Sequence, residues 1–249
     1  MLLDKEDLEK ESKFWYNRLT KRCNICNGKG IIEFKDKKPQ ECTCVKQVRV
    51  NTLLCSWGVP RKYLQENWQW NTIIEKPFVK KCKQYADEFE NNYLDNIGMF
   101  LYGGQGRGKS TMEVLIAKDI AKKINPDTGK NYTVAFCIYE DLIQLSFQRM
   151  KDNKAFDKFN ILTLNPDLLI IDNLGSETGI DSDSGHNKRL LETILRNRID
   201  KCMPTIISSN YTLDEIKNVY CDTIHDLIQE NCIIVNVFGD NFRKNVWGN

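Results

Sequence analysis

Long apolar runs are absent from this chain of 249 residues. No stretch approaches the roughly 20 apolar residues that a membrane-spanning helix needs. The charged opening of residues 1–7 is unlike a secretory signal peptide. Internal repeats and low-complexity segments are also missing. These absences predict a soluble, globular protein of the cytoplasm, and 41% hydrophobic residues are enough to build a sizeable core.

A strong net charge is missing too, because 36 Lys and Arg oppose 34 Asp and Glu. The small excess is N-terminal: residues 1–50 carry 12 basic and 8 acidic side chains, against 24 and 26 in the rest of the chain. Such an excess would favour contact with nucleic acid or with an acidic protein surface. A solvated mixture of charges is the simpler explanation for so small an imbalance.

A disulfide framework is not expected despite ten cysteines, because cytoplasmic thiols stay reduced. Four cysteines form two pairs, and the first pair has the Cys-x-x-Cys spacing that lets two thiolates of one tight turn reach the same metal ion. A strand at 31–34 and a turn at 35–39 would bring the pairs together. The segment is too small and polar to fold without a metal. We predict a structural zinc site, with free or redox-active thiols as the alternative; its ligands are Cys23, Cys26, Cys42 and Cys44.

The stretch Gly103–Ser110 matches the phosphate-loop pattern G-x-x-x-x-G-K-[ST] without a mismatch. An apolar strand at 99–102 precedes it, and apolar residues at helical spacing follow over 109–124. This context predicts that loop amides and the helix N-terminus bind phosphates. Lys109 would reach the β- and γ-phosphates, and Ser110 would bind Mg²⁺. The predicted nucleotide-binding residues are Gly103, Gly104, Gln105, Gly106, Arg107, Gly108, Lys109, Ser110 and Thr111.

A continuous apolar strand at 167–172 ends in Asp172, some sixty residues after the loop. A carboxylate at the C-terminal edge of a buried parallel strand is placed to hold Mg²⁺ through water. Further strands are expected at 134–138, 204–210 and 232–238, and helices at 79–93, 140–150 and 186–200. Thr212–Glu215 is a capping box that starts another helix. Alternating strands and helices predict an α/β fold with a parallel sheet covered on both faces.

Two aromatic segments lie ahead of the loop. Residues 4–20 place Leu8, Trp15 and Leu19 on one face of an amphipathic helix, which would pack on its own chain or dock another protein. Trp68 and Trp70 could stack on bases or adenine, but packing is the simpler interpretation.

In this order of motifs the chain resembles AAA+ helicase loaders of the DnaC/DnaI type and the related IstB transposition ATPases, over about residues 20–245. The Cys-x-x-Cys-x-Gly-x-Gly segment resembles the N-terminal module of many Gram-positive and phage loaders, and it favours a loader over an IstB-like protein. The other matching stretches are Gly58-Val-Pro-Arg-Lys-Tyr63, Ile170-Ile-Asp-Asn-Leu-Gly-Ser-Glu177, Pro204–Asn210 and Gly239-Asp-Asn-Phe-Arg243.

The resemblance implies an N-terminal module, residues 1–54, that grips the replicative hexameric helicase. It also implies an AAA+ ATPase domain, residues 55–249, that binds ATP, self-associates and contacts single-stranded DNA. Asn210 would be the sensor 1 residue, near the γ-phosphate or the attacking water, and Arg243 the sensor 2 candidate. Such a protein delivers the helicase to single-stranded DNA at replication initiation.

Two departures from the family bear on catalysis. Asn173 follows Asp172 where the family usually has Asp or Glu, and an amide orients water but cannot accept a proton as a base. The segment 223–230, which usually carries an arginine finger, has no arginine. An arginine finger is worth roughly 10³-fold or more in rate. We therefore predict binding of ATP or ADP with Mg²⁺, and hydrolysis that is slow or dependent on a partner.

Three alternatives stay open. The first is an ATP-binding adaptor that hydrolyses ATP weakly or not at all. The second is an IstB-like ATPase that works with a transposase. A small-molecule kinase shares the loop, but the sequence has no arginine-rich lid segment.

Overall fold

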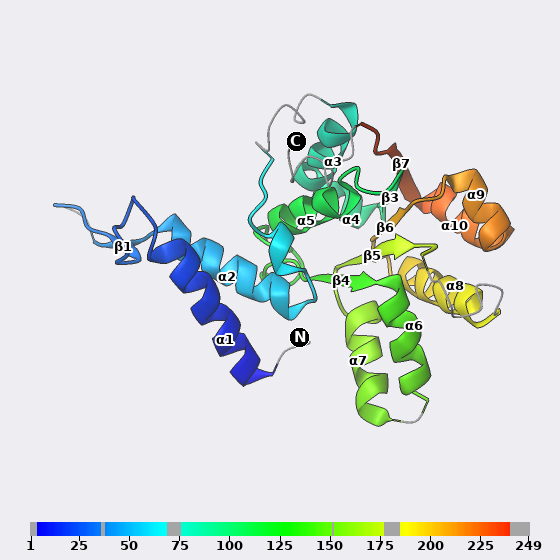
Figure 1. The fold of residues 1–249 in the computed structure, drawn as a ribbon, viewed down its shortest axis with the longest axis horizontal. Helices are drawn as coiled ribbons and strands as arrows, with labels where there is room; N and C mark the ends of the chain where they lie inside the picture. The colour runs from blue at the N-terminus through cyan, green and yellow to red at the C-terminus, as the bar shows by residue number, and fades with distance from the viewer. Residues whose placement is uncertain (1–3, 36–37, 69–75, 151, 177–184, 240–249) are drawn as a thin grey trace, which may run out of the picture.

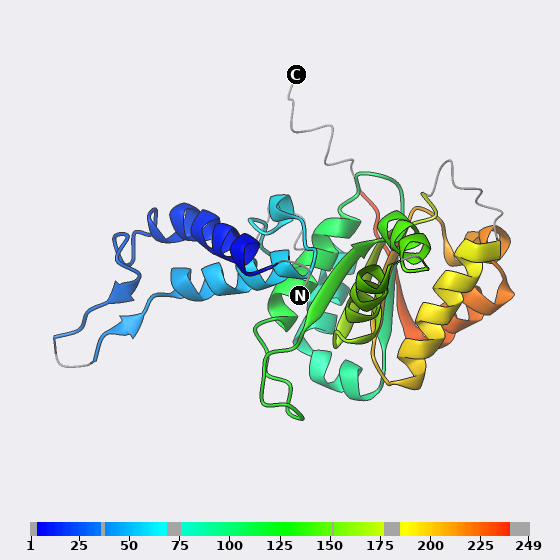
Figure 2. The ribbon, with the colours of Figure 1, turned by 90° about the horizontal axis from the view of Figure 1, so that it is seen from below.

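The computed structural model describes residues 4–35, 38–68, 76–150, 152–176 and 185–239. Its main body is a β-sheet with helices on both sides, and an arm built from the first elements of the chain extends from it (Figures 1 and 2). No helix among these residues is long and apolar enough to cross a membrane. The helices are α1 Lys5–Trp15, α2 Thr43–Ser56, α3 Pro77–Asp87, α4 Phe89–Leu94, α5 Lys109–Ile120, α6 Tyr139–Gln148, α7 Asn153–Leu164, α8 Gly185–Asp200, α9 Leu213–Val219 and α10 Asp222–Asn231.

The main sheet has five parallel strands in the order β4-β5-β6-β3-β7. Parallel neighbours need crossover connections, and helices supply these crossovers on both faces. The C-terminal ends of β3, β5 and β6 therefore meet at one edge of the sheet. The strands are β3 Gly98–Tyr102, β4 Val134–Ile138, β5 Leu168–Leu174, β6 Thr205–Ser209 and β7 Cys232–Asn236.

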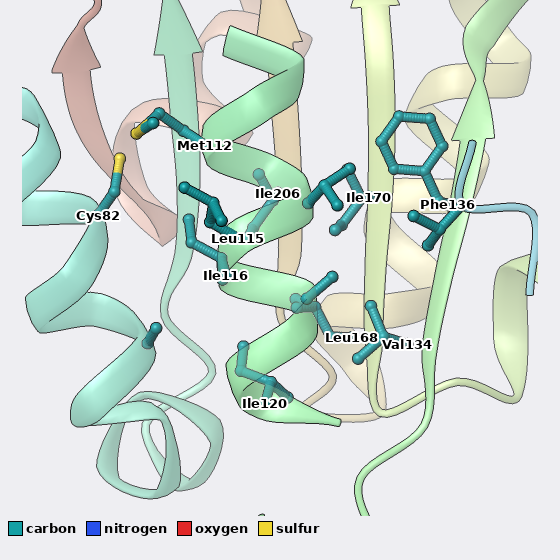
Figure 3. Close-up of a cluster of buried hydrophobic side chains, with 14 of the residues drawn as sticks. Cys82, Met112, Leu115, Ile116, Ile120, Val134, Phe136, Leu168, Ile170 and Ile206 are labelled. Atoms are coloured by element: carbon teal, nitrogen blue, oxygen red, sulfur yellow. The ribbon is translucent and has the colours of Figure 1, made fainter. Parts of the chain in front are cut away.

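Each strand contributes alternate residues to two cores, as the period of two in a strand requires. Met99 and Leu101 join α3 and α5 on one face, and Phe100 joins α6, α8 and α10 on the other. Figure 3 shows the first core, where Leu115 and Ile116 of α5 lie over the sheet. Because both faces are covered, the strands read as unbroken apolar runs.

The arm is a helical hairpin in which α1 runs outward and α2 returns to the sheet (Figures 1 and 2). A two-stranded antiparallel sheet, β1 Ile31–Ile32 with β2 Gln40–Glu41, lies at its tip. Trp15 of α1 is fully buried, and Leu54 of α2 belongs to the same core as α5. The apolar face of α1 therefore packs on its own chain.

The predicted parallel α/β fold is confirmed, and the strand at 134–138 has the expected bounds. Three helices, α2, α7 and α10, were not predicted, and the single helix expected at 79–93 is divided into α3 and α4. Trp68 packs against the core and donates to Asp119 Oδ2 at 2.7 Å, as the packing interpretation requires. Trp70 and residues 36–37 of the predicted turn lie outside the described residues.

Candidate nucleotide site and cysteine cluster

The phosphate-loop sequence forms the turn between β3 and α5, at the edge of the sheet where β5 and β6 also end. Gly103 has a φ of 148°, and a Cβ there would come within 2.2 Å of the Val237 carbonyl oxygen. Gly108 has a φ of 97° immediately before the first turn of α5. Side chains are strained at such angles, so glycine permits both the close approach to the backbone that follows β7 and the sharp entry into the helix.

Lys109 lies at the N-terminus of α5 and is almost fully buried. Its ammonium group donates to the carbonyl oxygens of Gly103 at 2.6 Å and Gly104 at 3.1 Å, and to Asn210 Oδ1 at 2.8 Å. Asn210 directly follows β6. Residues 101 positions apart in the sequence thus meet at the position where a phosphate would be held.

Asp172 of β5 faces the first turn of α5. The Ser110 hydroxyl donates to Asp172 Oδ2 at 2.9 Å, and the Ser208 hydroxyl donates to Asp172 Oδ1 at 2.7 Å. A serine hydroxyl beside a carboxylate is an all-oxygen donor set of the kind that Mg²⁺ prefers. The residues present therefore fit the expected cation: Ser110 would bind it directly and Asp172 through water.

Asn173 adopts a left-handed backbone with a φ of 66°, beside an irregularity in the pairing of β5 with β6. Its backbone N–H donates to Ser208 Oγ at 3.2 Å, and its side-chain amide donates to Ser176 Oγ at 2.6 Å. Asparagine tolerates this conformation better than most residues. The amide that replaces the usual acid is thus held by a local turn at the rim of the site.

A cavity of about 900 Å³ opens above the loop. Its phosphate side consists of the predicted loop residues from Gln105 to Thr111 with Asp172, Asn173 and Asn210. The opposite side comes from the segment after α2, with Pro60, Tyr63 and Glu66. A volume of this size holds a ligand as large as a nucleotide.

Lys118 of α5 holds the segment after α2 against α5, the helix that follows the phosphate loop. Its ammonium donates to the carbonyl oxygens of Leu64 at 2.9 Å and Glu66 at 2.5 Å. Burial lowers the pKa of Lys118 to about 8. Sequence reasoning missed this residue; the available signal was a lysine among the apolar residues of a buried helix.

Of the predicted site residues, the structure brings Lys109, Ser110, Asp172 and Asn210 together, with Asn173 at the rim. Arg243 and the motif residue Glu177 lie outside the described residues. Ser208, which holds Asp172, was not identified from the sequence.

The four clustered cysteines meet at the tip of the arm, with all sulfur atoms within 4.8 Å of one another. Cys23 Sγ lies 3.7 Å from Cys42 Sγ, and Cys26 Sγ lies 3.6 Å from Cys44 Sγ. Zn–S bonds of 2.3 Å in a tetrahedron place sulfurs about 3.8 Å apart. The N–H of Gly30 donates to Cys26 Sγ at 3.3 Å, and the backbone N–H groups of Cys26 and Ile25 lower the pKa of Cys23 to about 7. The donor set therefore fits Zn²⁺.

The parallel sheet, the phosphate loop and the acidic strand end together define a P-loop nucleotide-binding protein of the AAA+ class. More narrowly, the chain belongs to the family of IstB-like ATP binding proteins, whose model matches residues 84–247. The family resemblance seen in the sequence is thereby confirmed.

Two relatives are similar over most of the chain. The "Replicative helicase loader DnaI" of Bacillus subtilis is 25% identical over 198 residues, which cover 78% of this chain and 60% of that protein. The "Replicative helicase loader DnaC" of Escherichia coli K12 is 23% identical over 186 residues, 74% of this chain and 70% of that protein. The crystal structure of DnaI shares the fold, with a TM-score of 0.58 and 20% identity over 75% of this chain and 95% of that one. The chain thus matches only about three fifths of the length of the B. subtilis relative.

Proposed function

We propose that this protein is an ATP- and Mg²⁺-binding loader that delivers a replicative hexameric helicase to single-stranded DNA. The observation that carries the proposal is the combination, in one chain, of the Lys109, Ser110, Asp172 and Asn210 constellation with an arm that ends in four clustered cysteines. The printed names of the B. subtilis and E. coli relatives support this direction.

In the nucleotide site, we assign phosphate binding to the loop amides and to Lys109, which exchanges its carbonyl contacts for phosphate oxygens. Ser110 and Asp172 hold Mg²⁺, which neutralises phosphate charge when it is bound. Asn210 contacts the γ-phosphate or the attacking water, and Arg243 is the second sensor. Asn173 orients water. Without a base at this position, turnover is slow or depends on a partner.

We assign residues 1–54 to a zinc-binding module that contacts the helicase, and residues 55–249 to the ATPase domain. Thiolate geometry at the tip of the arm supports the zinc assignment. Ile25, between Cys23 and Cys26, exposes 64% of its surface, and Phe34, two residues after β1, exposes 45%. Exposed apolar side chains on a rigid, metal-closed tip suit a protein contact.

We assign the single-stranded DNA contact to the end of the α6–α7 hairpin, which protrudes from the sheet (Figure 1). Phe156 is 49% exposed there and Lys154 is nearby in the sequence; Phe147 is 40% exposed, with one face of its ring stacked on His186. Aromatic rings that stack on bases, combined with cations, are the usual means of holding single strands. The affinity should fall steeply with added salt.

The test is to mix the purified protein with its host's replicative helicase and measure the mass of any complex by light scattering, with ATP, with ADP and without nucleotide. We expect a complex that is lost in Cys26→Ser. Cys202→Ser, at an exposed cysteine far from the cluster in the sequence, is the matched control and should keep the complex. Absence of a complex in every condition would refute the loader assignment. The same data report self-association.

A second candidate, an adaptor that binds ATP without hydrolysing it, is favoured by one observation. The Asn173 amide is held by Ser176, and the described helix α10 has no arginine to offer a neighbouring subunit. A helicase complex whose mass is the same in all three nucleotide conditions would select the adaptor.

A further inference from the structure

A second cavity, of about 310 Å³, lies between α6, α7 and the edge of β4. The segment after α2 runs along this edge and forms one wall, because the N–H of Phe136 in β4 donates to the Trp57 carbonyl at 2.9 Å. Pro60, Phe136 and Ile138 line both this cavity and the nucleotide cavity. The two cavities are therefore neighbours.

The cavity combines an apolar interior with polar side chains at its mouth. Leu142, Leu145 and Leu162 line it and are almost fully buried. Four exposed polar side chains of the two helices surround them; these are Asp141, Gln144 and Gln148 of α6 and Lys158 of α7. An apolar pocket with a few polar groups directed at it is typical of a ligand site.

The four polar side chains are not engaged with the rest of the fold. Within the described part of the chain none of them makes a hydrogen bond or an ion pair. Asp141 and Lys158 line the same cavity from different helices and have opposite charges, yet they do not pair with each other. Their hydrogen-bonding groups therefore remain available to a ligand that lies between the helices.

The size and the lining match a nucleobase. Ligand pockets span roughly 300–1,000 Å³, and a cavity at the lower end of this range suits one ring system rather than a whole nucleotide. The flat face of a base can lie on the leucines, and its edge carries the donors and acceptors that carboxylate and amide side chains bind. Lys158 supplies a cation for the phosphate of the same strand.

We propose that this cavity binds one base of the single-stranded DNA and that Asp141 selects a base with an amino group. The inference rests on the proposed contact of the α6–α7 hairpin with single-stranded DNA, because both helices of that hairpin line the cavity. An ionised carboxylate only accepts hydrogen bonds. Cytosine offers its N4 amino group as a donor, whereas uracil and thymine present the O4 oxygen at that position, which a carboxylate repels.

The experiment measures, by fluorescence anisotropy, the affinity of the full chain with ATP and Mg²⁺ for two labelled single strands of equal length. One strand is built of deoxycytidine and the other of deoxyuridine, so that backbone and ring size are the same and only the edge of the base differs. We expect the wild type to prefer the cytosine strand by about tenfold, the size of one good contact to a base edge.

Asp141→Asn should reduce this preference to about twofold or less, because an amide can also donate to O4. Asp157→Asn is the matched control: it removes the same charge from an exposed position of α7 that does not line the cavity, and it should keep the preference. Lys158→Gln should weaken both strands alike and lower the dependence of log affinity on log salt by about one unit, at an unchanged preference.

A merely structural Asp141 predicts another result. It lies in the first turn of α6, where an acidic side chain also stabilises the helix. In that case Asp141→Asn would lower the melting temperature and leave the ratio of the two affinities at the wild-type value, and this outcome would overturn the inference. Equal affinity of the wild type for both strands would also overturn it, while the proposed DNA contact would stand.

Two further outcomes separate the inference from the proposed function. If the cavity holds a segment of the helicase instead, Asp141→Asn would weaken the helicase complex in light scattering and leave the strand preference unchanged, which would refute the base site alone. Binding of neither strand would refute the DNA contact of the proposed function together with the base site.

Discussion

Replacing Arg198 by methionine should destabilise the main body of the fold by about 3 kcal/mol. Arg198 in α8 is fully buried, although its guanidinium group is charged. It donates at 2.8–3.3 Å to five oxygen atoms around the N-terminal ends of β5 and β6; these acceptors are Thr163 O, Pro166 O, Asp167 O, Pro204 O and Thr205 Oγ1. One side chain therefore fixes the start of both strands whose C-terminal ends carry Asp172 and Asn210.

The magnitude follows from two opposing terms. Five hydrogen bonds at about 1 kcal/mol each contribute about 5 kcal/mol. The methionine variant no longer has to bury a guanidinium, whose desolvation costs several kcal/mol, and this gain offsets part of the lost hydrogen-bond free energy. The same desolvation lowers the pKa of Arg198 to about 10. A net loss of about 3 kcal/mol remains for Arg198→Met. Arg198→Lys should lie between the variant and the wild type, because an ammonium has only three N–H groups.

Urea unfolding followed by circular dichroism measures this loss. At an m-value of about 3 kcal/mol/M, the midpoint of Arg198→Met should fall by about 1 M. Arg196→Met is the matched control, because Arg196 lies on the same helix, is half-exposed and pairs with Glu192 at 2.8 Å. Exposed pairs contribute about 0–1 kcal/mol. Equal midpoint shifts in the two variants would refute the argument that the buried hydrogen bonds stabilise the strand ends.

Further predictions concern the site and the arm. Lys118→Met leaves the Leu64 and Glu66 carbonyls unpaired and should weaken nucleotide binding tenfold or more in a fluorescence titration, since two such bonds contribute about 2 kcal/mol, which is about 30-fold. Because the pKa of Lys118 is about 8 in the fold and 10.5 when unperturbed, the unfolded chain binds more protons between these values. The free energy of unfolding should therefore gain a positive contribution as pH rises from 8 to 10.5, and urea titrations of Lys118→Met should lack it. Chelation of zinc should expose residues 21–44 to limited proteolysis while the sheet stays protected, and equal cleavage with and without chelator would count against the metal site. Asn173→Asp supplies a proton acceptor in a conformation that aspartate tolerates, and phosphate release should rise tenfold or more; unchanged turnover would show that another step limits hydrolysis.

The sheet could be predicted from the sequence because its strands are buried on both faces and read as unbroken apolar runs. The phosphate loop could be predicted equally well, because the spacing of its glycines, lysine and serine is set by the way the backbone surrounds a phosphate. The helix α7 carried an overlooked signal, because Ala155, Phe159 and Leu162 repeat at helical spacing behind the capping residue Asp152.

Other features depend on long-range contacts that a single sequence does not contain. The acceptors of Lys118 lie 52 and 54 residues away, and no local pattern links them. The left-handed backbone of Asn173 depends on its hydrogen bonds with Ser208 and Ser176. The hydrogen bonds and backbone conformations of the site were therefore harder to predict than the residues that form it.

The arm and the nucleotide cavity are physically connected through the segment between α2 and the sheet. This segment leaves α2 at Ser56, and the N–H of Phe136 in β4 donates to the Trp57 carbonyl at 2.9 Å. Arg61, in the same segment, donates from Nε to both carboxyl oxygens of Glu11 in α1, at 2.9 and 3.1 Å. The segment is thus joined to both helices of the arm, to α1 by an ion pair and to α2 by the chain itself. For the loader proposed above, this connection would be a route of bonded and hydrogen-bonded groups between the nucleotide site and the arm.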